Sequence, residues 1–148
     1  MQSFVNNPVV EFKEGDIRDT ALLEQCIAGC DYVFLLRALR INACAANQQE
    51  GFDVMLHATF NVAELCKKHA VKKVIYSSSA SVYGLAQHFL QRRKQTIHNN
   101  QTFYGAAKMW GEQLFRSINL CTDWIMSLCA ISMYMANEWI PTENIQKS

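Results

Sequence analysis

The sequence of 148 residues lacks most of the features that mark special classes of protein. Its formal net charge is only +1, which gives no electrostatic case for binding nucleic acid or an anionic membrane. Its six cysteines include no C-x-x-C pair and its four histidines are scattered, so we expect no metal site and no dithiol redox site. The polar start, Met1–Pro8, has no apolar core of the kind that a secretory signal requires. We therefore expect a cytoplasmic protein with reduced thiols.

No apolar run is long enough to cross a bilayer. Trp124–Ala136 has 13 residues, whereas a membrane-spanning helix needs about 20. Asp123 precedes this stretch and would be costly in lipid, so we predict a buried strand followed by a loop. Gln91–Gln95 contains three consecutive basic residues, which is typical of a solvated loop. We expect neither a membrane nor a nucleic acid as a partner.

What the sequence does contain is the balance of an ordinary globular domain. Half of its residues are hydrophobic and 18% are charged. Apolar stretches of strand length alternate with amphipathic segments of helix length, and this order predicts an α/β fold with a parallel sheet. We expect strands at residues 9–13, 32–36, 74–76 and 124–129, helices at residues 20–26, 49–69 and 102–118, and a loop at residues 84–101.

Three of these segments carry more detailed predictions. Tyr32–Leu36 is continuously apolar, the pattern of a strand buried on both faces. Asp19 or Thr20 can cap the short helix that ends before Gly29. In the helix at 49–69, residues at helical spacing mark one buried face: Phe52, Met55, Leu56, Thr59, Ala63 and Cys66.

Tyr104 and Lys108 lie four residues apart in the last expected helix, so they share one face. A phenol has an ordinary pKa of about 10, and a nearby ammonium lowers that pKa by favouring the phenolate. Such a tyrosine could exchange a proton with a hydroxyl group of a substrate. The alternative is a surface lysine packed beside a half-buried tyrosine, and the spacing alone does not decide between the two.

A run of serines, Ser77–Ser79 with Ser81, follows the strand expected at Val74–Tyr76. Ligands of open parallel sheets bind at the carboxyl ends of the strands, where these hydroxyls would lie. The alternative is a serine-rich turn whose side chains satisfy their own backbone.

Together, the segments VKKVIYSSSASVYG and FYGAAKMWGEQLF resemble the NAD-dependent epimerase/dehydratase family, extended short-chain dehydrogenases of the UDP-glucose 4-epimerase type. In that family the third serine of the run lies 25 residues before the catalytic tyrosine, as Ser79 does before Tyr104. The resemblance implies that Ser79 donates a hydrogen bond to the substrate oxygen and that Tyr104 is the acid/base. It implies that Lys108 anchors the ribose of NAD and lowers the pKa of the tyrosine.

An earlier segment, Gly15–Asp19, resembles the family's G-D-[IL]-x-D motif. The resemblance implies that Asp16 and Ile17 contact the adenine of NAD. Without it, Asp16 would be interpreted as a turn or helix-capping residue. The implied partners are NAD and a nucleotide-linked sugar.

The sequence departs from the family at both ends. It has no G-x-x-G-x-x-G turn, the element that holds the pyrophosphate of NAD at a helix N-terminus. We therefore expect residues 1–148 to form a single partial NAD-binding Rossmann-like domain, matching the family over about 9–117. It would lack the first βαβ unit and the C-terminal substrate domain. Because exposed sheet edges pair or aggregate, we expect one of three outcomes: the chain rearranges, its open sheet edge pairs with a second copy or another chain, or it is a fragment of a longer product.

Two interior positions also differ. Arg37 stands where the family has small residues beside the cofactor, and Met55 stands where it has an asparagine that contacts the cofactor. Three hypotheses remain open at this point. The chain is a nucleotide-sugar epimerase or dehydratase that needs further parts, a catalytically silent truncated homologue or interaction fragment, or a hydroxysteroid dehydrogenase-like oxidoreductase.

Overall fold

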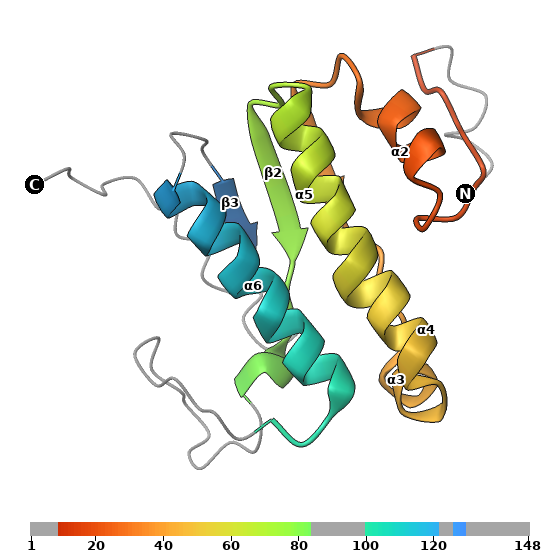
Figure 1. The fold of residues 1–148 in the computed structure, drawn as a ribbon, viewed down its shortest axis with the longest axis vertical. Coiled ribbons are helices and arrows are strands. Elements are labelled where there is room, and N and C mark those ends of the chain that lie inside the picture. Colours follow the sequence, from red (N-terminus) through yellow and green to blue (C-terminus); the bar gives the residue numbers. More distant parts are fainter. Residues whose placement is uncertain (1–8, 84–99, 122–125, 130–148) are drawn as a thin grey trace, which may run out of the picture.

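The chain forms an α/β structure around a small parallel sheet (Figure 1). The computed structural model describes residues 9–83, 100–121 and 126–129. The strands are β1 (Tyr32–Leu35), β2 (Lys73–Ser77) and β3 (Met126–Cys129). They lie in the order β1-β2-β3, and both pairings are parallel. The fold class expected from the sequence, a partial Rossmann-like sheet, is confirmed.

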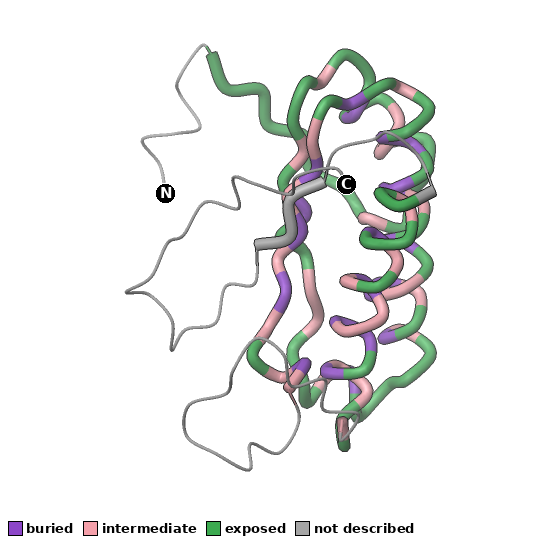
Figure 2. Tube along the Cα trace, turned by 90° about the vertical axis from the view of Figure 1, so that its left-hand side faces the viewer, coloured by how far each residue is buried: buried purple, intermediate pink, exposed green. Residues whose placement is uncertain are grey.

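The helices form a layer against one face of this sheet (Figure 2). The two long ones run alongside each other in front of the strands in Figure 1: α5 (Ala58–Lys68) and α6 (Phe103–Cys121). The remaining helical elements are α2 (Thr20–Ile27), α3 (Ile41–Ala46), α4 (Gln48–Phe52), the π-helical turn η1 (Asp53–His57) and the 3₁₀ turn η2 (Ala80–Tyr83).

The short helix α2 begins where the sequence predicts. The Asp19 side chain accepts hydrogen bonds from the backbone N–H groups of Ala21 and Leu22, which would otherwise be unsatisfied at a helix start. Gly29, just past the end of the helix, has φ of +81°. This left-handed conformation suits glycine and ends the helix.

The long helix predicted at 49–69 is α4, η1 and α5 in succession. Met55 and Thr59 are buried as expected, and the Thr59 hydroxyl donates to the backbone carbonyl of Met55 at 2.7 Å. The prediction for Phe52 is wrong, because its side chain is 47% exposed. A π turn adds a residue to the helical period and so rotates the preceding turn away from the buried face.

The core lies between the sheet and the two long helices. On β2, Val74 and Tyr76 point toward the helices and are buried, while the alternate residues are only half-buried. Val62 and Cys66 of α5 and Phe115 of α6 meet them there. The core therefore fixes β2, which ends two residues before Ser79, against α6, which carries Tyr104 and Lys108.

The strand predicted at Val9–Lys13 is wrong, because these residues belong to no strand of the described chain. Apolar and β-branched residues favour an extended backbone, but a strand also needs a hydrogen-bonded neighbour. Val9 and Phe12 are largely exposed.

The prediction that Tyr32–Leu36 is buried on both faces is also wrong. Leu35 faces the helices and is buried, whereas Phe34 is 65% exposed on the opposite face, with Tyr32 and Leu36. The helices of the described residues cover only one face of the sheet, and β1 is its end strand. The segment 84–99 of the predicted loop and residues 124–125 of the predicted last strand lie outside the described residues, and the rest of that strand is β3.

Glu24 joins α2 to the end of α5. Its Oε1 accepts hydrogen bonds from Lys68 Nζ at 2.5 Å and from His69 Nε2 at 3.0 Å. Hydrogen bonds from Lys68 and then His69 lower the pKa of Glu24 below 4.5. A carboxyl group with a lowered pKa stabilises the folded chain above its ordinary pKa, and that stabilisation is lost as the pH falls through the lowered value.

Glu24→Gln is therefore expected to lower the melting temperature at pH 7, and the gap from the parent should close as the pH falls below 4.5. Melting curves between pH 7 and pH 3 measure this gap. Glu64→Gln, at an exposed position of α5, is the control. A gap that stays constant over the whole range would contradict the role of Glu24.

Candidate active site at the carboxyl end of β2

The helix α6 presents Tyr104 and Lys108 one turn apart, as the spacing predicts. The side chain of Thr102 precedes the helix and accepts a hydrogen bond from the backbone N–H of Gly105 at 3.1 Å. This contact satisfies one of the unpaired donors of the first turn. Tyr104 is half-buried and packs against a small cluster that includes Met55 and Ala107.

Lys108 is a buried residue and is not a surface lysine. Its side chain is 1% exposed, and its Nζ donates to the backbone carbonyl of Ser77 at 2.6 Å. The same ammonium lies 4.8 Å from the centre of the Tyr76 ring. Burial lowers the pKa of Lys108 from its ordinary value. The alternative of a surface lysine, which the sequence left open, does not apply.

The three consecutive serines have three different surroundings. The Ser77 carbonyl accepts from Lys108, and the buried Ser78 hydroxyl donates to Glu112 of α6. Ser79 is half-buried, and its Oγ accepts the backbone N–H of Ser81 at 3.2 Å. Ser79 therefore satisfies its own turn, as the second interpretation of the serine run expects, while its neighbours bind α6.

Gly105 brings this turn close to Tyr104. A Cβ atom at position 105 would lie 2.8 Å from the backbone oxygen of Ser81, so only glycine allows the first turn of α6 to approach so closely. The turn held by Ser79 and the helical turn that carries Tyr104 are therefore neighbours. The structure brings Ser79, Tyr104 and Lys108 to one end of β2.

Sequence reasoning missed two contacts in this region. Glu112 lies one turn beyond Lys108 and accepts from Ser78. The Tyr76 hydroxyl is buried with no hydrogen-bond partner among the described residues, and it lies against Gly111. Burial, followed by the charge of Glu112, raises the pKa of Tyr76. Tyr104, Lys108 and Glu112 follow one another at intervals of four residues, so the sequence already indicated that Glu112 shares the face of the helix that carries the predicted site.

Asp16 and Ile17 form a second region, next to the segment that follows β1. Arg18 donates to Asp16 through Nε at 2.9 Å and through Nη2 at 2.5 Å. These hydrogen bonds hold the pKa of Asp16 at about 2. Together with Glu14, Gly15 and Arg37, these two residues line an open cleft of about 260 Å³.

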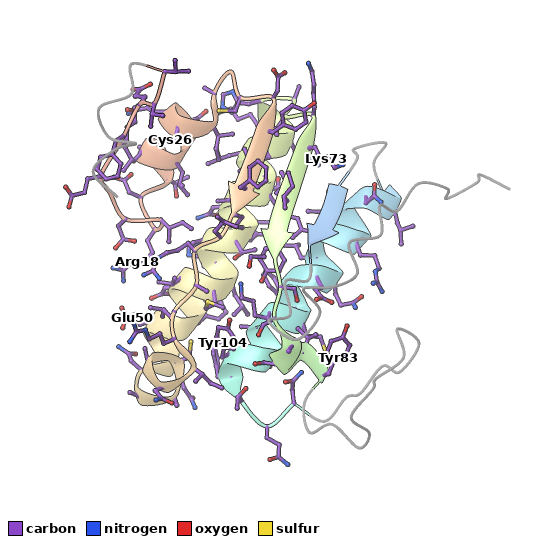
Figure 3. The ribbon with its side chains drawn as sticks, turned by 180° about the vertical axis from the view of Figure 1, so that it is seen from behind. Arg18, Cys26, Glu50, Lys73, Tyr83 and Tyr104 are labelled. Carbon is purple, nitrogen blue, oxygen red and sulfur yellow. The ribbon has the colours of Figure 1, made fainter. Side chains whose placement is uncertain are left out.

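The cleft and the serine turn are separate places in the structure. Figure 3 shows Arg18 near α2 and Tyr104 at the start of α6, on either side of the segment after β1. Arg37 lies in this segment and lines the cleft, and its Nη1 donates to the carbonyl of Ala38 at 2.6 Å. Arg37 thus places a guanidinium in the cleft, where the resemblance predicts small residues.

Met55 also has a definite role. It lies in η1, it is 2% exposed, and its Sδ accepts the backbone N–H of Leu39 at 3.3 Å. Met55, at the position where the resemblance predicts an asparagine, therefore holds the segment after β1 in place through the backbone of Leu39. No metal-ligand cluster occurs among the described residues, and none of their helices is long and apolar enough to span a membrane.

Comparison with known proteins agrees with this geometry. Residues 2–131 match the model of the NAD dependent epimerase/dehydratase family. The chain belongs to this family. The match includes the cleft of Asp16, the serine turn and the helix α6, so every element of the candidate site lies within it.

Individual members of the family show how much of a whole protein this chain represents. It is 34% identical over 102 residues to N-acetyl-alpha-D-glucosaminyl-diphospho-ditrans,octacis-undecaprenol 4-epimerase of Escherichia coli O157:H7, covering 69% of this chain and 30% of that protein. It is 29% identical over 112 residues to human UDP-glucose 4-epimerase, covering 74% of this chain and 32% of the human protein.

A solved structure is similar over a larger part of the chain. UDP-glucose 4-epimerase from Bifidobacterium longum, in complex with NAD+ and UDP, has a TM-score of 0.78 and 29% identity. The similarity covers 87% of this chain and 39% of that one. The chain thus spans about a third of the length of the curated relatives that it matches.

Proposed function

We propose that this chain supplies the proton-transfer residues and the adenosine side of the NAD site of a nucleotide-sugar epimerase or dehydratase. The observation that carries the proposal is the position of Tyr104 and Lys108 against the serine turn at the carboxyl end of β2. Ligands of open parallel sheets bind at this edge. The family matches are a further support, because the named relatives include UDP-glucose 4-epimerases.

In this proposal Tyr104 moves the proton. Its hydroxyl would exchange a proton with a sugar hydroxyl, as a general acid/base does. Lys108 is fixed by Ser77 and would favour the phenolate through its positive charge. Ser79 would turn its hydroxyl from Ser81 to the oxygen of the substrate.

The described residues fit the two ends of an NAD molecule. The low pKa of Asp16 keeps its carboxylate ionised, and an exposed carboxylate can accept hydrogen bonds from ribose or adenine. An ammonium has three donors, and the Ser77 carbonyl uses one of those of Lys108, so the others can bind a ribose hydroxyl. When bound, NAD supplies the acceptor for hydride from the sugar carbon.

A thermal-shift titration with NAD tests the cofactor part of this proposal. Excess ligand should raise the melting temperature by several degrees in a saturable way, because NAD binds the folded chain only. Asp16→Asn should need more NAD for the same rise. Tyr104→Phe should keep the rise and lose the conversion of UDP-glucose to its 4-epimer.

The titration also distinguishes the proposed function from the hypothesis of a catalytically silent homologue. A sample that melts cooperatively with no saturable rise would contradict cofactor binding and favour a catalytically silent homologue. A rise that Asp16→Asn leaves unchanged would place the adenosine elsewhere than in the cleft of Asp16.

A further inference from the structure

The end of β2 is attached to α6 by a contact at each turn of the helix. Gly105 lies against the backbone of Ser81, Lys108 binds the carbonyl of Ser77, and Glu112 binds the hydroxyl of Ser78. Since three positions along one helix contact the same short segment, Ser77–Ser81, the end of β2 and the turn after it are held against α6.

Of these three contacts, the one between Ser78 and Glu112 joins two side chains and has a carboxylate as its acceptor. Ser78 is 5% exposed, and its Oγ donates to Glu112 Oε1, which is half-buried. Hydrogen bonds to carboxylates are stronger than neutral ones, and removing one partner leaves the other buried and unsatisfied. The bond therefore resists movement of Ser78 relative to α6.

Ser78 is directly followed by Ser79, whose hydroxyl is the one predicted to contact the substrate. The Ser79 carbonyl accepts the N–H of Val82 at 3.1 Å, and its Oγ accepts the N–H of Ser81. A movement of Ser78 would therefore reach both of these bonds. The position of the Ser79 hydroxyl depends on where Glu112 holds its neighbour.

We propose that Glu112 is a positioning residue that sets Ser79 relative to Tyr104 by binding Ser78. The inference deepens the proposed function and rests on it, because the relative placement of Ser79 and Tyr104 has consequences only if these residues act on a substrate. Ser77 and Ser78 are then the anchored residues of the run, and Ser79 is the one left for the ligand.

Hydrogen–deuterium exchange tests the position of Ser79 without any turnover. The amides of Ser81 and Val82 report directly on the Oγ and the carbonyl of Ser79. Ser78→Ala and Glu112→Ala should each speed the exchange of these two amides by roughly tenfold, since one charged hydrogen bond is lost. Exchange of the α2 amides should stay at the parent rate.

Two further variants separate positioning from general stability. Glu112→Gln keeps an acceptor oxygen for Ser78 and should recover most of the protection. If Glu112→Ala fails to fold, Ser78→Ala alone measures the loss of the bond. The amides of Ser81 and Val82 should exchange no faster in the double variant Ser78→Ala/Glu112→Ala than in either single variant, because both changes remove the same bond. Glu64→Ala, at an exposed glutamate of α5, is the matched control and should change nothing.

Turnover supplies the second measurement. Ser78→Ala should lower kcat for the conversion of UDP-glucose while the NAD midpoint of the thermal-shift titration stays within twofold of the parent. Parent-like exchange at Ser81 and Val82 in Ser78→Ala, or an equal rise at α2, would overturn the inference. A parent chain that fails to bind NAD would instead overturn the proposed function, and the exchange result would still judge the role of Glu112 in holding the turn.

Discussion

Gly111→Ala is expected to lower the free energy of unfolding by about 2 kcal/mol, although alanine normally stabilises the interior of a helix by about 1 kcal/mol over glycine. A Cβ atom at this position would lie 2.6 Å from Cζ and 2.9 Å from Cε1 of Tyr76. The Tyr76 ring is 1% exposed and packs against Phe115, with 5.1 Å between ring centres. The ring has no free space to enter, so α6 must move away from β2.

Chemical denaturation of the parent, Gly111→Ala and Tyr76→Phe measures this effect. Tyr76→Phe alone should stabilise the chain by about 1 kcal/mol, because it removes a buried hydroxyl that has no partner among the described residues. Combined with Gly111→Ala, it should restore part of the lost stability. Glu64→Ala is the control for alanine in an exposed helix. A Gly111→Ala chain more stable than the parent would show that α6 and Tyr76 are not in tight contact.

Lys108→Met is expected to weaken NAD binding by roughly 10- to 100-fold, the loss for one charged hydrogen bond, and to abolish turnover. The same change should alter the free energy of unfolding by less than about 1.5 kcal/mol. Methionine fills a similar volume, and removal of the buried charge offsets the loss of the bond to Ser77. Lys108→Met should therefore impair NAD binding and turnover while it leaves the free energy of unfolding nearly unchanged.

The pH dependence gives an independent check on Lys108. Burial lowers its pKa below 10.5, so the unfolded chain keeps this proton to a higher pH than the folded chain does. The contribution of Lys108 to the free energy of unfolding therefore rises with pH between the lowered pKa and 10.5. Lys108→Met should lack that rise, whereas Lys67→Met, at an exposed site of α5, should keep it. Parent-like NAD binding by Lys108→Met would contradict the proposed role.

Local signals in the sequence were sufficient for several parts of the fold. Asp19 and Gly29 bound α2 because capping and a left-handed residue act within a few positions of the chain. The predicted strand at 74–76 lies within β2, and the predicted helix at 102–118 lies within α6 except for its first residue. Periodicity also placed Tyr104 and Lys108 on one face.

Burial was harder to predict, because it depends on neighbours that are distant in sequence. Phe34 has the composition of a core residue, yet it faces away from the helices. Val9–Lys13 has strand-like residues, yet it belongs to no strand of the described chain. A hydrophobic side chain tends to be buried, but only the packing of whole elements decides which face of a strand or helix is covered.

The sequence by itself determined the α/β fold class, the family, and the spacing of Ser79, Tyr104 and Lys108, because these depend on local backbone preference and on motif. Only the tertiary structure decided that Lys108 is buried against Ser77, that Ser78 binds Glu112, and that Gly105 and Gly111 let α6 approach β2. These contacts join residues that are about 30 positions apart in the chain, and their energies exist only when a buried donor, acceptor or ring meets its partner across the core.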